Sequence, residues 1–280
     1  IIGARQGPTY TEWTEDLDEL KRLVQAIGVE ISGVLCGGCT VEQIRRAPSA
    51  ELNASWCYDW GQKLGDLMQE RFDVPYARTG QPYGPTATEE WLLGVAVPLG
   101  LEDRARALIR QEMAGVAREL DTLRRCFEGK TALIEISEFP GPIRALSLAT
   151  MATEFGAHPI VINLHPYTVK ERLPSLKFLL ERGQNPEVIL TEGLFSLGSF
   201  SVSSRTQDEV ASIAAQVENA LYLGSPLRQP GVPQLNMTTI TGFPQYGYAG
   251  IRNIARLVET SLEHAARPRS RLFRQVLYGA

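Results

Sequence analysis

The sequence predicts an α/β fold of two Rossmann-like domains with parallel sheets, joined by a long helical connector. Short apolar runs alternate with helical patterns along both halves, which is typical of parallel sheets covered by helices. The 280 residues are 44% hydrophobic, which is enough for the cores of two ordinary domains. Residues 102–127 form one helical pattern in which Gly115 is the only helix-breaking residue. We expect a first domain over residues 1–100, the connector over 101–129 and a second domain over 130–280.

The first half begins with an amphipathic helix and continues with strands and helices in turn. Apolar residues from Leu17 to Ile27 share one helical face, acidic residues in the first turns suit the positive end of that helix, and Gly28 ends it. The apolar run at 29–35 predicts a strand. Residues 50–55 predict another strand, and the helix that follows carries an apolar face from Trp60 to Met68.

The second half repeats this alternation. We expect strands at 131–137, 159–164, 187–192, 219–224 and 232–238, and helices at 143–155, 169–183, 210–217 and 246–266. Parallel sheets of this kind bind ligands outside the carboxyl ends of their strands, where loops run into helix starts. The loops that follow the strands are therefore the places to search for functional residues.

Composition limits the possible partners and the compartment. The net charge of -4 and the pI near 5.6 provide no basic field, which argues against nucleic acid or a membrane surface as the main partner. No apolar run reaches the roughly 18 residues that span a bilayer, and the start of the chain has no signal pattern, so we expect a cytoplasmic protein. The chain lacks an initiator methionine and begins on an apolar pair, so we expect a fragment of a longer protein.

Cys57 lies where the predicted strand at 50–55 gives way to a helix. The free N–H groups and the partial positive charge of a helix N-terminus favour a thiolate over a thiol. A thiolate at this place is a nucleophile or a metal ligand. The alternative is a small apolar side chain packed beneath the helix.

The other cysteines are too few for a disulfide framework, so reduced thiols or ligands are expected. Cys36 and Cys39 have the spacing of a redox dithiol or of half a metal site, and together with Cys57 they could offer three thiolates to an iron-sulfur cluster. The alternative is a Gly-Gly turn flanked by small buried thiols. Cys126, on the helical connector, is expected to be packed.

Three polar residues follow predicted strands of the second domain. Arg144 ends a Gly- and Pro-rich turn at 137–144, where it and the backbone N–H groups could hold a carboxylate or phosphate; an ordinary turn is the alternative. His165 could donate to an anionic ligand or bind a metal, or could be held by nearby backbone. Glu192 could line the same cleft or be solvated. The sequence has no GxGxxG, P-loop, GxSxG or HExxH motif, so dinucleotide-binding, nucleotide-hydrolysing, hydrolase and zincin functions have no support.

Several stretches in order resemble one known family. The stretch "LNASWCYDWGQKLGDLMQERFDVPY" with "GPTATEEWL", preceded by "IGVEISGVLCGGCTVEQI", is similar to the alpha-type chains of nitrogenase component 1. The stretches "GKTALIEISEFPGPIRALSLATMATEFGAHPIVI" and "SPLRQPGVPQLNMTTITGFPQYGYAGIRNIARLVE" resemble the third domain and the closing segment of the same family. The resemblance covers nearly the whole chain, without the family's first domain.

The resemblance implies a function. Cys57 would be the thiolate ligand of an iron-sulfur or metal-sulfur cluster, and a homologous sister subunit and an ATP-dependent iron-sulfur reductase protein would be the partners. Thr238 and Thr239 stand where catalytic molybdenum-iron alpha chains have a histidine ligand, which argues against dinitrogen reduction. A nitrogenase-like oxidoreductase and a cofactor-assembly scaffold remain open, and so does a non-redox module that binds a small anion. For cofactor binding we single out Arg144, His165, Glu192 and Thr238.

Overall fold

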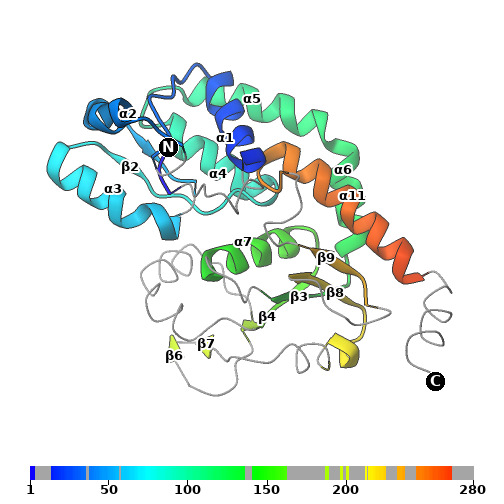
Figure 1. Ribbon diagram of the computed structural model, residues 1–280. Helices are drawn as coiled ribbons and strands as arrows, with labels where there is room; N and C mark the ends of the chain where they lie inside the picture. Colours follow the sequence, from blue (N-terminus) through cyan, green and yellow to red (C-terminus); the bar gives the residue numbers. More distant parts are fainter. Residues whose placement is uncertain are drawn as a thin grey trace.

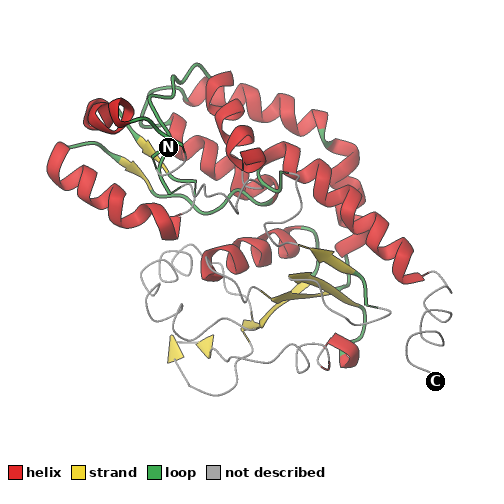
Figure 2. Ribbon diagram, viewed as in Figure 1, coloured by secondary structure: helices red, strands yellow, loops and turns green. Residues whose placement is uncertain are grey.

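The computed structural model describes most of the chain. The described residues are 1–3, 14–35, 38–56, 58–135, 141–162, 187–188, 196–197, 200–201, 212, 214–224, 232–236 and 244–266. The N-terminus and helices α1 to α5 lie in one part of the molecule, and the larger sheet lies in the other (Figure 1). Most of the described helix is in the first part and most of the described strand is in the second (Figure 2).

The first part contains a small parallel sheet flanked by helices. In chain order its elements are α1 (Thr14–Ala26), α2 (Val41–Arg46), η2 (Ala47–Ser49), β1 (Asn53–Ala54), α3 (Tyr58–Phe72), β2 (Tyr76–Ala77) and α4 (Gly84–Ala96). Strands β1 and β2 pair in parallel, and Ile2 adds a parallel bridge to Ser55. These pairings place the end of β1 in the middle of a three-stranded arrangement.

The expected strand at 29–35 is wrong. The described residues of this segment have no strand, although Val34 and Leu35 are buried in the core. Their backbone makes separate bonds, such as Leu35 N to the Ile1 carbonyl at 2.9 Å and Val29 N to the Val24 carbonyl at 3.0 Å. The apolar residues at the end of this segment are therefore buried, but its backbone does not form the repeated hydrogen bonds of a strand.

The connector is two helices, α5 (Glu102–Gly115) and α6 (Ala117–Phe127), where one continuous helix was expected. The break is at Val116, whose φ of -118° and ψ of 13° leave the helical region. The Val116 side chain is fully buried, so the core holds the bend in place.

The second part has a doubly wound parallel sheet. Its elements are β3 (Thr131–Glu135), α7 (Gly141–Glu154), β4 (His158–Ile162), β5 (Glu187–Val188), β8 (Ala220–Gly224) and β9 (Gln234–Asn236), and a separate antiparallel pair is formed by β6 (Ser196–Leu197) and β7 (Phe200–Ser201). The strand order is β5-β4-β3-β8-β9, with all neighbours parallel. This is the Rossmann order, with its topological switch point between β3 and β8.

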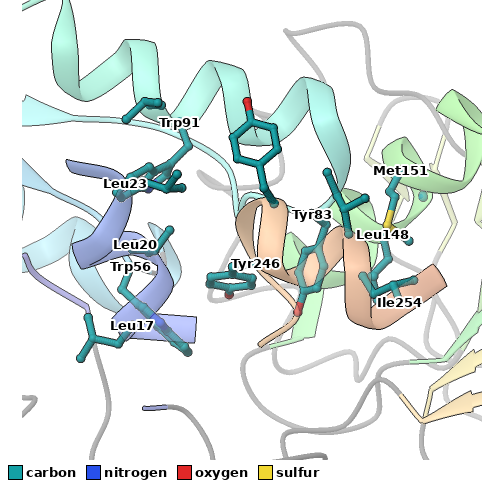
Figure 3. Packing of buried hydrophobic residues seen from close by; sticks show 14 of the residues in the cluster. Leu17, Leu20, Leu23, Trp56, Tyr83, Trp91, Leu148, Met151, Tyr246 and Ile254 are labelled. Atoms are coloured by element: carbon teal, nitrogen blue, oxygen red, sulfur yellow. The ribbon is translucent and has the colours of Figure 1, made fainter. Parts of the chain in front are cut away.

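The last described helix joins the two parts. Helix α11 (Gly247–Ala266) packs against β9 of the larger sheet and also against α6, α4 and α1. Ile251, Ile254 and Val258 of this helix belong to the same buried cluster as Leu17 and Leu20 of α1, and Figure 3 shows part of this cluster. The predicted α/β class with parallel sheets is confirmed, whereas the boundaries at 100 and 129 stay a prediction.

Among the described helices, none combines the length and the apolar character needed to cross a membrane.

Candidate functional site

The structure describes the residues on both sides of Cys57. Strand β1 ends at Ala54, Trp56 N donates to the Ile2 carbonyl at 2.8 Å, and helix α3 begins at Tyr58. The indole N–H of Trp91 in α4 donates to the Ser55 carbonyl at 2.7 Å, which fixes the end of the strand from the other side. The predicted passage from strand to helix is confirmed, while Cys57 itself lies outside the described residues.

Two glycines fix how α3 lies on the sheet. A Cβ on Gly65 would lie 2.5 Å from the ring of Tyr76 in β2, and a Cβ on Gly61 would lie 3.3 Å from Ile2 and from the Tyr76 hydroxyl. The helix therefore approaches the Tyr76 ring more closely than any side chain there would allow. Because α3 begins directly after Cys57, this approach sets where the helix starts.

The segment at 244–247, which we call the junction segment, meets the end of β1. The ring of Tyr246 lies 5.6 Å from the ring of Trp56, the residue before Cys57, and 5.0 Å from the ring of Tyr83 in an edge-to-face arrangement. In Figure 3, Tyr246 lies between Trp56 on one side and Tyr83 on the other. Aromatic packing thus joins the β1–α3 junction to the start of α11.

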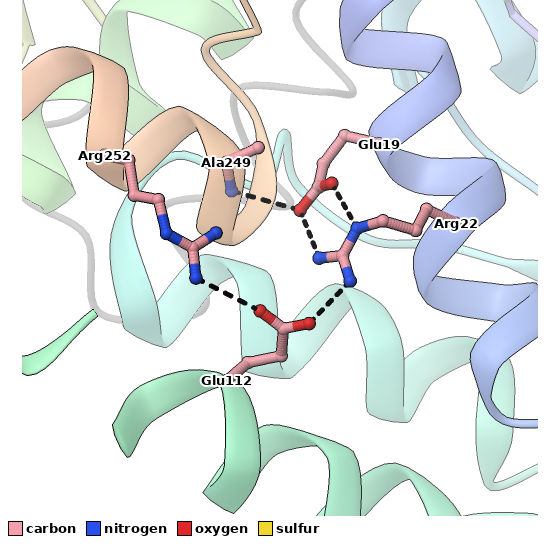
Figure 4. Close-up of polar contacts among 5 residues, drawn as sticks. All are labelled: Glu19, Arg22, Glu112, Ala249 and Arg252. Carbon is pink, nitrogen blue, oxygen red and sulfur yellow. Dashed lines mark hydrogen bonds and ion pairs between the residues drawn. The ribbon is translucent and has the colours of Figure 1, made fainter. Parts of the chain in front are cut away.

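Two carboxylates of α1 hold the same segment. Asp16 accepts hydrogen bonds from Gln245 N at 2.5 Å and from Tyr246 N at 2.9 Å. Glu19, one turn later, accepts one from Ala249 N at 3.1 Å and is paired with Arg22 (Figure 4). The first N–H groups of a helix have no partner within the helix, and here another helix supplies the acceptors.

Burial and neighbouring charges shift the pKa values of two groups around this contact. Burial raises the pKa of Asp16 to about 6, although the bonds from Gln245 N and Tyr246 N and the charge of Arg144 act against the rise. Hydrogen bonds to Glu19 and Glu112 raise the pKa of the Arg22 guanidinium, which stays protonated. Glu112 of α5 also lies 3.8 Å from Arg252 of α11, so one network of charges links α1, α5 and α11.

Two glycines allow the junction segment to pass this closely. Gly247 has a φ of +65°, its N–H donates to the Pro82 carbonyl at 3.0 Å, and a Cβ there would lie 2.7 Å from Glu19. A Cβ on Gly250 would overlap the carbonyl group of Gln245. Both positions have room for the hydrogen of a glycine but not for a Cβ atom.

Arg144 reaches the junction segment from α7. Its side chain is buried, and its Nη2 donates to the Gln245 side-chain oxygen at 3.0 Å. Its Nε is buried and has no hydrogen-bond partner among the described residues. A buried guanidinium whose Nη2 is held and whose Nε–H has no partner among the described residues suits an anionic group such as a carboxylate or phosphate.

The remaining predicted residues have different outcomes. His165, Glu192, Thr238, Cys36 and Cys57 lie outside the described residues. Cys39 is half-buried and lines a surface cavity of about 300 Å³ that Lys21 also lines. Cys126 is packed in α6 as expected, and burial raises the pKa of its thiol. No three His, Cys, Asp or Glu side chains within the described ranges are placed to hold a metal ion.

Sequence reasoning missed Asp16, Gln245 and Tyr246. Asp16 and Glu19 were interpreted as acids suited to the positive end of their own helix. The missed signal is that these two acids, three residues apart, flank the buried Leu17 on a helix that packs against the core, so they point toward other elements.

A comparison with protein families decides the relationship. The profile described as "Nitrogenase component 1 type Oxidoreductase" matches residues 3–263. The chain belongs to this family. The expected resemblance is therefore confirmed over nearly all of the sequence.

Relatives within the nitrogenase component 1 family differ in their named roles. A nitrogenase molybdenum-iron protein alpha chain of Methanothermobacter thermautotrophicus is 22% identical over 94% of this chain and 55% of its own length. The nitrogenase iron-molybdenum cofactor biosynthesis protein NifE of Clostridium pasteurianum is 28% identical over 50% of this chain and 30% of its own length. The molybdenum-iron alpha chain of the same organism is 24% identical, over 63% and 34%. The chain thus spans about a third to about half of the length of these relatives.

A solved structure titled "Nitrogenase Cp1 at pH 5" has the same fold. Its TM-score is 0.64 at 16% sequence identity, and the match covers 97% of this chain and 60% of that chain. The likeness extends over both parts of the molecule described above.

Proposed function

We propose that this chain is the alpha-type part of a nitrogenase-like component 1 oxidoreductase that holds a metal-sulfur cluster through Cys57. The observation that carries the proposal is the β1–α3 junction, in which Cys57 stands between Trp56, fixed to Ile2 and Tyr246, and the first residue of α3. A thiolate is stabilised at such a helix start by the free N–H groups. The chemistry supplied by a bound cluster would be electron storage and transfer to a substrate.

The residues near the junction segment suit an anionic cluster or cluster-bound group. Arg144 supplies a buried positive charge and an Nε–H without a partner among the described residues, and its Nη2 is held by Gln245. Such a fixed guanidinium would orient a negatively charged group without a reorganisation of its own. His165, Glu192 and Thr238 are further candidates for cofactor binding, from their positions after predicted strands.

A cofactor-assembly scaffold is the second candidate. Thr238 and Thr239 replace the histidine ligand of the catalytic alpha chains, so a bound cluster would keep one protein thiolate ligand and could be released more readily. The relationship to the cofactor biosynthesis protein NifE favours the same function. For either function we propose two partners: a homologous sister subunit and an ATP-dependent iron-sulfur protein. We further propose a cytoplasmic location.

Iron content tests the proposal. The protein is purified without oxygen, supplied with iron and sulfide, desalted and assayed for bound iron, bound sulfide and visible absorption. We expect bound iron in the parent chain and in Cys126→Ala, because Cys126 is packed in α6. We expect Cys57→Ala to lose the bound iron. Equal iron in Cys57→Ala and Cys126→Ala would contradict the proposal.

A non-redox module that binds a small anion is the third candidate, favoured by the unpaired Nε of Arg144. A colourless protein that binds an anion equally well with and without Cys57 would support this function.

A further inference from the structure

A chain of three side chains links α1 to α7 through the junction segment. The Asp16 carboxylate accepts a hydrogen bond from the backbone N–H of Gln245, and the side-chain oxygen of Gln245 accepts one from Nη2 of Arg144. Asp16 lies in α1, Gln245 lies just before α11, and Arg144 lies in the first turn of α7, so each contact joins two different segments. The conformation of Arg144 therefore depends on a carboxylate in a different part of the sequence.

The arrangement is costly for a purely structural contact. Asp16 is partly buried, which disfavours its charged form, and the buried Nε of Arg144 has no partner among the described residues. A buried donor without a partner destabilises the folded state, and more so when it is charged. An anionic ligand that accepts a hydrogen bond from Nε would remove that cost.

The contacts also restrict how Arg144 can move. Gly250 has no room for a Cβ next to the Gln245 carbonyl, and Gly247 is fixed to Pro82, so the junction segment cannot shift along α11. The Nη2–H and the Nε–H of an arginine lie on the same edge of the guanidinium, so the bond from Nη2 to Gln245 limits the directions that the Nε–H can take.

We propose that Asp16 and Gln245 are positioning residues, which hold Arg144 so that its Nε–H faces a small anionic group, a carboxylate or an oxyanion, beside the junction segment. This inference rests on the proposed function only in the role it gives Arg144. It extends that function by naming the residues that orient the anion site. Cys57 takes no part in this arrangement.

Sulfate binding to the 280-residue chain tests the inference, with sulfate as the probe because its charge is constant from about pH 5 to about pH 8. Titration calorimetry near neutral pH measures the affinity. We expect Arg144→Gln to abolish binding and Gln245→Ala and Asp16→Ala to weaken it about 5- to 10-fold, the loss expected for one orienting hydrogen bond. Asp16→Asn should restore most of the affinity, because an amide oxygen still accepts the N–H of Gln245.

The matched control is Asp18→Ala, which removes an exposed carboxylate of the same helix that is paired only with Lys21 among the described residues. This control should bind sulfate as the parent does. Circular dichroism and the thermal midpoint show whether each variant is folded, and Asp16→Asn keeps the test valid if Asp16→Ala does not fold. Folded Asp16→Ala and Gln245→Ala variants with parental affinity would overturn the inference.

A parent chain that binds no sulfate, or binds it equally in Arg144→Gln, would also overturn the inference. Neither result bears on the iron content of Cys57→Ala, so the proposed function and the positioning role fail separately.

Discussion

The starts of α3 and α11 both lie beside the candidate site, but they are fixed by different forces. The start of α3 is fixed by shape, because Gly61 and Gly65 let the helix lie directly against Ile2 and the ring of Tyr76. The start of α11 is fixed by charge, because Asp16 and Glu19 accept the N–H groups of the junction segment and of Ala249. A contact fixed by shape is insensitive to pH and salt, whereas one fixed by a buried carboxylate responds to pH.

The largest effect on stability is expected at Gly250, where close packing meets the segment that the carboxylates hold. In Gly250→Ala the new methyl group would overlap the Gln245 carbonyl, so the junction segment would have to move away from Asp16 and Arg144. We expect a loss of about 4 kcal/mol in the free energy of unfolding, measured by urea denaturation. The control is Gly115→Ala in α5, where the nearest atom is a flexible Arg252 nitrogen at 3.4 Å. An equal effect at both positions would refute this account of Gly250.

A smaller effect is expected at the helix fixed by shape. Gly65→Ala places a methyl group 2.5 Å from the Tyr76 ring and should cost about 2–3 kcal/mol, whereas Gly61→Ala, at 3.3 Å, should cost less than about 1 kcal/mol. Urea denaturation at two pH values measures both. The difference between the two variants should not change with pH, since no titrating group takes part. A reversed order would mean that α3 does not lie on Tyr76 as described.

The smallest effect is expected from the pH dependence of Asp16. Its folded pKa of about 6 exceeds the unfolded value of 3.8, so the folded state binds the proton more tightly. The stability contributed by this group is fully present below about pH 4 and is lost as pH rises through about 6, by up to about 2 kcal/mol. Glu15 adds to the rise and Arg144 opposes it.

The Asp16→Asn variant isolates this contribution. Subtracting its free energy of unfolding from that of the parent should give a difference that falls between about pH 4 and about pH 6 and is level above. Asp18→Asn, which changes an exposed carboxylate on the same helix, is the matched control, and the fall should be larger for Asp16→Asn than for this control. A parent-minus-Asp16→Asn difference that rises with pH would show that the hydrogen bonds to Gln245 N and Tyr246 N outweigh burial.

The spacing of apolar residues predicted the helices and strands that depend on neighbouring residues. It missed the features that depend on contacts with distant parts of the chain. Helix α7 and strands β3 and β4 were found because their apolar residues have a clear period. The run at 29–35 is equally apolar, but its backbone bonds go to Ile1 and Val24. The bend at Val116 has no sequence marker beyond Gly115, because burial of the Val116 side chain holds it.

The same distinction applies to the site. The setting of Cys57 between strand and helix was predictable from adjacent residues. Arg144 was selected from its turn, and its role in binding stays a prediction. The bond from Arg144 to Gln245 spans 101 residues, and the bond from Gln245 to Asp16 spans 229. A pattern within one helix can show that an acid points toward another element, but it cannot name a partner 229 residues away, so Asp16 was interpreted as an acid that served its own helix.

The packing of α11 has a consequence for synthesis on the ribosome. Domains usually fold in the order in which they emerge, the N-terminal one first. Here α1, α4 and α6 share their buried cluster with Ile251, Ile254 and Val258, so these three helices leave the tunnel with an apolar face uncovered. That face stays open while more than a hundred further residues are translated, and a nascent chain of this kind would need protection from aggregation until α11 arrives.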